Sequence, residues 1–319
     1  MSQALSTRDH GGGIDAARSH YGGARGDWVD LSTGINPIAY PVGQLAADAW
    51  TALPDSLAME RLLRAARQFW NVPDEAMVVA APGASALIAM MPFLTRGPSV
   101  YIPQPTYNEH EAAFRAQGRL CVDAARDAGV HVHVHPNNPD GRKITRDDVT
   151  KDAFTIIDES FCDSCPDDSL VALTARTGVV VLKSFGKFWG LAGTRLGFAI
   201  ARPDTAGRLA DMLGPWAVSG PAMQIGARAL EDREWASDTR LRLERDAQRM
   251  DLLMGGQGAG FVGGTSLFRT YEVKDAAALQ DRLAKAHIWT RIFPYSTTWI
   301  RFGLPATDQD WARLEGALS

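Results

Sequence analysis

The stretch from residue 77 to residue 184 constrains the fold most, because short apolar runs alternate there with helical patterns such as GASALIAMMPFL. Runs this apolar, separated by helices, indicate strands covered on both faces, as in a mainly parallel α/β sheet. In such sheets ligands bind where strands end and helices begin. The predicted strands are MVVAA, SVYIP, HVHVH, FTIID and GVVVLKS.

The pattern changes after about residue 203, where long helical stretches such as WASDTRLRLERDAQRMDLLMG dominate. Shorter strand and helix patterns follow, up to a closing helix, and together they indicate a smaller α+β unit. We predict a large domain over residues 30–205. A small α+β domain is predicted from residues 1–29 together with residues 206–319.

Composition excludes several classes of function. The 319 residues are 45% hydrophobic and carry a formal net charge of -4, without a basic run of the kind that binds nucleic acid. No segment approaches the roughly 18 consecutive apolar residues of a membrane span, and the N-terminus lacks a secretion pattern. We therefore expect a cytoplasmic protein with no nucleic-acid and no membrane partner.

Two signals for metal or redox chemistry are weak. HVHVH places His131, His133 and His135 on one face of a strand, but the run leads directly into NNPDG, so we interpret it as sheet packing and expect no metal. Cys162 and Cys165 have redox spacing without a second pair. With Cys121 they are expected to be free thiols in a reducing compartment.

Four polar signals fall just past predicted strands: APGAS, HPNNPDG, IIDES and KSFGKFWGLAGTR. In this order and spacing they resemble the fold-type I pyridoxal-phosphate enzymes, the aspartate aminotransferase superfamily, over most of the chain. The resemblance implies a large α/β domain with a mainly parallel, seven-stranded type of sheet flanked by helices, and a smaller α+β domain. It also implies pyridoxal 5'-phosphate as the cofactor and a homodimer with its active site near the subunit interface.

The resemblance assigns different roles to two lysines that stand four residues apart. Lys187 matches the lysine of the family's S-x-x-K segment, whose amine forms a Schiff base with the cofactor aldehyde, and a partly buried site should lower its pKa. Lys183 lies on the predicted strand, where we expect it to snorkel or to pair with a carboxylate.

Three further residues resemble those that hold the cofactor ring. Asp158, at the end of FTIID, matches the aspartate that keeps the ring nitrogen protonated and so makes the ring an electron sink. Asn138 matches the asparagine that donates to the phenolic oxygen, and Tyr107 stands where the family stacks an aromatic side chain on the ring.

The cofactor phosphate requires backbone amides at a helix N-terminus, hydroxyls and a cation. By position, Gly83, Ala84 and Ser85 resemble the amide-and-hydroxyl cup, Ser184 the second hydroxyl, and Arg195 the cation. Three departures from the family pattern leave fewer hydrogen-bonding groups for the cofactor. Gly186 replaces a serine, Phe161 replaces a tyrosine, and Leu53 replaces the tyrosine of a Tyr-Pro step.

The expected substrate contacts come from both ends of the chain. Arg301, in WIRFG, resembles the arginine that binds the substrate α-carboxylate with a bidentate guanidinium. HGGGIDAAR and DLSTGINP resemble the N-terminal segments of the cobalamin-pathway threonine-phosphate decarboxylase branch, to which the histidinol-phosphate aminotransferases are near neighbours. This resemblance makes His10, Gly11 and Asn36 candidates for binding the substrate phosphate.

The implied activity is that of a lyase: L-threonine O-3-phosphate would give (R)-1-amino-2-propanol O-2-phosphate and carbon dioxide in cobalamin biosynthesis. Lys187 would exchange its imine for the substrate amine and is a candidate for returning a proton to Cα. Two alternatives remain open. One is an aminotransferase of the histidinol-phosphate type, and the other is a non-catalytic subunit of this fold that partners a corrinoid amidation enzyme.

Overall fold

The computed structural model describes residues 10–319, so the first nine residues of the predicted segment 1–29 lie outside the described residues. The helices are α1 (Ile14–Tyr21), α2 (Asp48–Thr51), α3 (Ser56–Phe69), α4 (Ala84–Leu94), α5 (Asn108–Ala116), α6 (Pro203–Leu213), α7 (Gly220–Glu231), α8 (Arg233–Gly256), α9 (Ala276–Lys285) and α10 (Asp308–Leu318). The strands are β1 (Val29–Asp30), β2 (Met77–Ala81), β3 (Ser99–Tyr101), β4 (Leu120–Val122), β5 (Val130–Val134), β6 (Phe154–Asp158), β7 (Val179–Ser184), β8 (Gly197–Ala201), β9 (Gly260–Thr265), β10 (Phe268–Glu272), β11 (Ile288–Trp289), β12 (Arg291–Phe293) and β13 (Ser296–Phe302).

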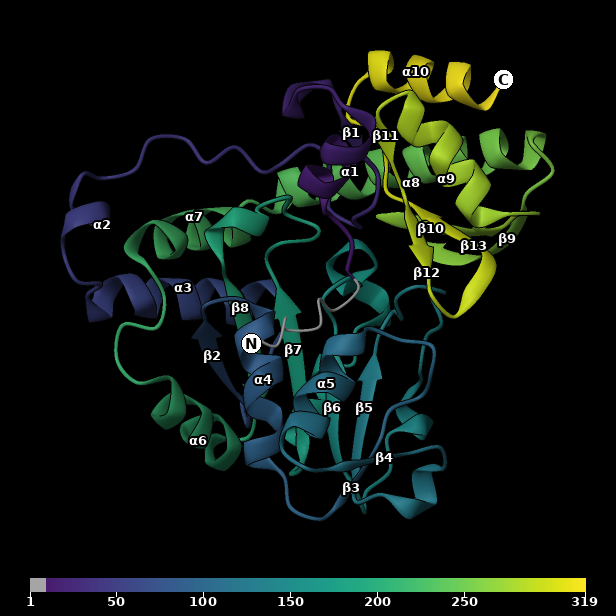
Figure 1. Ribbon diagram of the computed structural model, residues 1–319. Coiled ribbons are helices and arrows are strands. Elements are labelled where there is room, and N and C mark those ends of the chain that lie inside the picture. Colours follow the sequence, from purple (N-terminus) through teal and green to yellow (C-terminus); the bar gives the residue numbers. More distant parts are fainter. Residues whose placement is uncertain (1–9) are drawn as a thin grey trace, which may run out of the picture.

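A seven-stranded sheet in the order β2-β8-β7-β6-β5-β3-β4 forms the larger part of the molecule, in the lower half of Figure 1. The strands from β7 to β4 run parallel, whereas β8 is antiparallel to both β7 and β2. The α/β class and the mainly parallel sheet predicted from the apolar runs are therefore confirmed.

Helices cover both faces of this sheet, which explains why its strands are apolar on both sides. Helices α4, α5 and α6 bury side chains against one face, with Val132, Ile156 and Leu182 at its centre. Helices α3 and α7 pack on the other face, in the core cluster that contains Ile157 and Val181.

The C-terminal part builds a second, antiparallel sheet in the order β12-β13-β10-β9, seen at the upper right of Figure 1 together with α9 and α10. The N-terminal segment joins this part, because β1 pairs in parallel with β11 and α1 packs with Ala284 of α9. The limits of the two predicted domains, 30–205 and 1–29 with 206–319, stay a prediction.

Among residues 10–319, no helix combines the length and the apolar character that a membrane crossing requires.

Candidate active site

The residues predicted to hold the cofactor converge on one cavity at the ends of the strands. All of them line this inner cavity: Gly83, Ala84, Ser85, Tyr107, Asn138, Asp158, Ser184, Lys187 and Arg195. They lie at the start of α4, at the ends of β6 and β7, and in the loops that follow β3, β5 and β7, so the sheet gathers segments that are far apart in the sequence.

The N-terminus of α4 forms an anion cup at one end of the inner cavity. Gly83 has φ 91, and a Cβ on it would lie 2.7 Å from Nη2 of Arg195, so only glycine lets this guanidinium approach the helix N-terminus. Gly197 is similarly required, because its Cβ would lie 2.4 Å from the Ala84 nitrogen. Backbone amides, Ser85, Ser184 and Arg195 thus surround a space suited to a phosphate.

Lys187 projects into the same cavity from the loop after β7. Burial, the nearby Arg301 and Arg195 lower its pKa to about 8, although the Asp158 carboxylate opposes this. Its Nζ lies 5.4 Å from the ring centre of Phe161. The neutral, nucleophilic form of Lys187 therefore appears as the pH rises through about 8, well below the pH that an exposed lysine requires.

Asp158 is held as a carboxylate at the floor of the inner cavity. Its Oδ2 lies 2.8 Å from Nε2 of His110, and its Oδ1 accepts a 2.9 Å hydrogen bond from the Ser160 nitrogen. Burial raises the pKa of Asp158, but the contacts with His110 and Ser160 outweigh it, so the pKa is lowered. A permanent buried charge at this point can stabilise a cationic ring nitrogen.

His110 was not predicted from the sequence. It is fully buried and stands one helical turn after Tyr107 on α5, which is the spacing that brings two side chains to one face of a helix. This spacing is the only feature of the sequence that relates His110 to the site, and it does not indicate Asp158 as the partner of His110.

Asn138 and Arg301 meet between the two sheets. Nη1 of Arg301 donates to Oδ1 of Asn138, and Nη2 donates to the Ser32 backbone oxygen at 2.7 Å. Arg301 is 5% exposed, and its Nε has no hydrogen-bond partner within residues 10–319. Burial and the neighbouring Arg291 lower its pKa to about 10, so it remains a cation that an anionic ligand would stabilise.

An outer cavity opens directly from the inner one and shares Tyr107, Asn138, Phe161 and Lys187 with it. His10, Gly11 and Arg301, which are the predicted substrate contacts, line this outer cavity. A Cβ on Gly11 would lie 2.4 Å from the Ser32 oxygen, so a glycine is needed where the N-terminal segment passes Arg301.

A second arginine, Arg291, lines the outer cavity and was missed by sequence reasoning. It stands directly opposite Arg301 in the antiparallel ladder of β12 and β13. Like charges opposite each other on one ladder destabilise a sheet. The sequence shows two arginines ten residues apart, but the hairpin register that pairs them is visible only in the structure.

Asn36, predicted to contact the substrate phosphate, does not line either cavity as residues 10–319 form them. It is 2% exposed, its Nδ2 donates to the Phe188 oxygen at 2.8 Å, and its Oδ1 accepts from Arg242 at 2.6 Å. Both polar atoms of the Asn36 side chain thus hold the chain next to Lys187.

The three departures from the family pattern have different surroundings. A Cβ on Gly186 would lie 3.2 Å from Cα of Ala192, so a serine would have to displace backbone there. Phe161 packs edge-on against Phe268 beside Lys187. Leu53 is 67% exposed and lies outside both cavities as residues 10–319 form them.

Comparison with known proteins agrees with this geometry. Residues 41–314 match the family model for aminotransferase class I and II. A threonine-phosphate decarboxylase from Sinorhizobium sp is 38% identical, and one from Pseudomonas aeruginosa is 37% identical, each over 97% of this chain and 97% of the relative. In fold, the chain resembles a histidinol-phosphate aminotransferase from Sinorhizobium meliloti solved with pyridoxal-5'-phosphate, with TM-score 0.82, 18% identity, and coverage of 96% of this chain and 93% of that one.

Proposed function

This chain belongs to the aminotransferase class I and II family, and we propose that it uses pyridoxal 5'-phosphate to decarboxylate L-threonine O-3-phosphate. The products would be (R)-1-amino-2-propanol O-2-phosphate and carbon dioxide, and the pathway cobalamin biosynthesis. The two threonine-phosphate decarboxylases that match over nearly the whole chain support this choice.

The donor set of the inner cavity fits the cofactor. The α4 amides, Ser85, Ser184 and Arg195 would hold its phosphate, Asp158 its ring nitrogen, Asn138 its phenolic oxygen and Lys187 its aldehyde carbon. Once bound there, the cofactor supplies an electron sink for the bonds at the substrate Cα. The protein supplies the lysine amine, holds the ring protonated through Asp158, and keeps Lys187 available to return a proton to Cα.

The observation that carries the choice of substrate is the pair of arginines opposite each other on β12 and β13. Two facing cations next to Lys187 are stabilised when anionic groups lie beside them. An amino acid with both a carboxylate and a phosphate supplies two such groups. Arg301, which is buried and carries an unused Nε, suits the carboxylate, and Arg291, which donates to the His10 backbone oxygen, suits the phosphate. His10 would join Arg291 at the phosphate by leaving Glu109, whose Oε1 lies 3.0 Å from its Nε2.

The proposal is tested by comparing L-threonine O-3-phosphate with L-threonine as substrates of the purified, cofactor-loaded protein. Carbon dioxide release is expected from the phosphorylated substrate, with a kcat/KM at least about 10²-fold above that for threonine, because two charge-assisted contacts are lost with the phosphate. Equal rates for both substrates would contradict the proposed specificity.

Replacing Arg291 by leucine is expected to raise KM for L-threonine O-3-phosphate by about 10²-fold with little change in kcat. The lost contact with the phosphate is charge-assisted but does not touch the reacting carbon. The matched control is the reaction with L-threonine, whose kcat/KM should not change in this variant. An equal loss with both substrates would show that Arg291 does not recognise the phosphate.

We also propose a homodimer. Exposed apolar side chains near α2 and in the loop after α6 support it, because they line one hollow on the surface. Trp50, Leu53 and Trp216 are 70%, 67% and 58% exposed and line one hollow with Thr194, the neighbour of Arg195. Trp216 holds φ 58, a strained conformation for a bulky side chain. Replacing Trp216 by lysine is expected to give monomers in analytical ultracentrifugation, whereas a wild-type monomer would refute the dimer.

A cytoplasmic location and the absence of a nucleic-acid partner remain predictions from composition.

A further inference from the structure

Lys183 is buried between two carboxylates and is the chain neighbour of Ser184, which lines the inner cavity. Its Nζ lies 2.6 Å from Oε2 of Glu159 and 3.6 Å from Oδ1 of Asp163, and the three residues are 1%, 1% and 3% exposed. Burial lowers the pKa of Lys183, but the two carboxylates outweigh it and raise the pKa above its ordinary value. Lys183 is therefore a permanent cation, unlike Lys187 four residues later.

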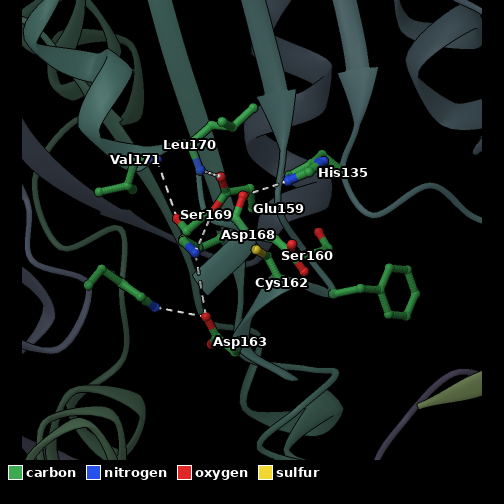
Figure 2. A network of polar contacts seen from close by, with 12 residues as sticks. His135, Glu159, Ser160, Cys162, Asp163, Asp168, Ser169, Leu170 and Val171 are labelled. Atoms are coloured by element: carbon green, nitrogen blue, oxygen red, sulfur yellow. Dashed lines mark hydrogen bonds and ion pairs between the residues drawn. The ribbon is translucent and has the colours of Figure 1, made fainter. Parts of the chain in front are cut away.

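Glu159 connects this ion pair to the segment that follows Asp158. Its backbone nitrogen donates to the Leu182 oxygen at 2.9 Å, which joins the ends of β6 and β7. Its side chain accepts from the Leu170 nitrogen at 2.6 Å and from the Ser169 hydroxyl at 2.7 Å. Figure 2 shows Glu159, Ser169 and Leu170 together at one end of this network and Asp163 at the other.

Asp163 holds the chain on both sides of Lys187. It pairs with Lys183 on one side, and on the other it accepts a 3.0 Å hydrogen bond from the indole nitrogen of Trp189. Trp70 donates to its other oxygen at 2.8 Å, and Arg240 of α8 donates to its backbone oxygen at 2.8 Å. The buried carboxylates of Glu159 and Asp163 are thus accompanied by two cations, Lys183 and Arg240.

A metal would not explain this cluster, although His135, Glu159 and Cys162 approach one another closely enough to suggest one. Nδ1 of His135 accepts from the Ile144 nitrogen, so Nε2 carries the proton and donates to the Asp168 oxygen at 2.8 Å. Glu159 already has Lys183 and two further donors. Both ring nitrogens of His135 and both carboxylate oxygens of Glu159 are therefore already engaged with protein partners.

We propose that Lys183, Glu159 and Asp163, here called the Lys183 cluster, are positioning residues that fix Lys187 relative to Asp158. Lys183 precedes Lys187 by four residues, and Trp189, which is hydrogen-bonded to Asp163, follows it by two. Glu159 is the chain neighbour of Asp158, so the cluster connects the segments that carry Lys187 and Asp158. None of the three lines the inner cavity as residues 10–319 form it, so they act through these neighbours. A buried ion pair fits this task, because losing one partner leaves an uncompensated charge and shifts the chain around it.

Replacing Lys183 by methionine is expected to lower kcat by about 10²-fold with KM nearly unchanged, because a small misplacement of a catalytic group costs rate rather than binding. Lys183→Arg should recover most of the loss. The matched control is Lys143→Met, which removes a 2.8 Å ion pair with Asp168 whose side chains are 52% and 33% exposed, and it should leave kcat unchanged.

A second readout does not depend on the substrate. The visible absorbance of the loaded protein changes as the Lys187 nitrogen takes up a proton, and in Lys183→Met its pH midpoint should rise, because water entering the loosened site favours the charged form. The kcat measurement rests on the proposed function, whereas this titration does not. Inactive wild-type protein would therefore refute the proposed function and leave the positioning role to be decided by the titration.

A lower melting temperature with kcat and the absorbance midpoint both unchanged would overturn the proposal, because the cluster would then serve stability alone. If Lys183→Met does not fold, the Trp189→Phe variant tests the positioning role instead. It keeps an aromatic ring beside Phe185 and removes the hydrogen bond to Asp163, together with the part of the indole that stacks on Trp235. An approximately tenfold lower kcat is expected with unchanged KM, and wild-type kcat and midpoint in this variant would reject the positioning role.

Discussion

Replacement of Lys187 by alanine is expected to abolish decarboxylation, with kcat lowered on the order of 10⁴-fold or more. The variant loses both the amine that attaches the cofactor and a proton carrier in the catalytic step. The cofactor phosphate should still bind, because the α4 N-terminus, Ser184 and Arg195 are unchanged. Borohydride reduction followed by mass spectrometry should find cofactor fixed to wild-type protein and none fixed to the variant.

The pH dependence of cofactor attachment gives an independent check of the same residue. Because the pKa of Lys187 is lowered to about 8, the neutral amine appears as the pH rises through 8, whereas an exposed lysine requires a pH near about 10.4. Attachment to the wild-type apoprotein should accelerate with that lower midpoint. Lys285→Ala, which removes an exposed lysine paired with Asp281, should behave as wild type, and cofactor fixed to Lys187→Ala would contradict the assignment.

Replacement of Asp158 by alanine is expected to lower kcat by about 10²- to 10³-fold, since one preorganised charge at the reacting ring is lost. Asp158→Asn should lose nearly as much, although its amide oxygen can still accept from His110, because the neutral side chain cannot hold a ring nitrogen protonated. Steady-state kinetics and the visible spectrum of the loaded variants measure the effect.

The control for Asp158 is Asp148→Asn, whose carboxylate accepts hydrogen bonds from Thr145 away from the inner cavity. It should keep wild-type kcat. Near-normal activity in Asp158→Asn would show that hydrogen bonding, rather than charge, is what this position contributes.

The central sheet could be predicted because its strands are buried on both faces. Runs such as Phe154–Asp158 and Val179–Ser184 are short and mostly apolar, as expected of strands that are covered on both faces. The structure places them as neighbouring parallel strands. The cofactor residues could be predicted as a group, because the motifs that carry them stand at the ends of such strands, in an order that resembles the family, and parallel strands end at one edge of the sheet. Their individual roles stay predictions until they are tested.

What the sequence could not reveal depends on contacts between distant segments. The register that sets Arg291 opposite Arg301 is fixed by a bulged hairpin, and the two partners of Lys183 lie in the segment that follows β6. The surroundings of Asn36 show the same limit. A polar residue in a loop can face a cavity or hold backbone, and only the positions of Phe188 and Arg242 decide between the two.

The most direct test of the proposed activity is to measure carbon dioxide and amine products from L-threonine O-3-phosphate with and without 2-oxoglutarate. The structure and its relatives predict one carbon dioxide per substrate consumed, the same rate without the oxo-acid, and aminopropanol phosphate as the product. Turnover that requires 2-oxoglutarate, forms glutamate and releases no carbon dioxide would contradict the decarboxylase and identify an aminotransferase. A loaded protein that supports neither reaction would contradict both activities and favour the non-catalytic subunit.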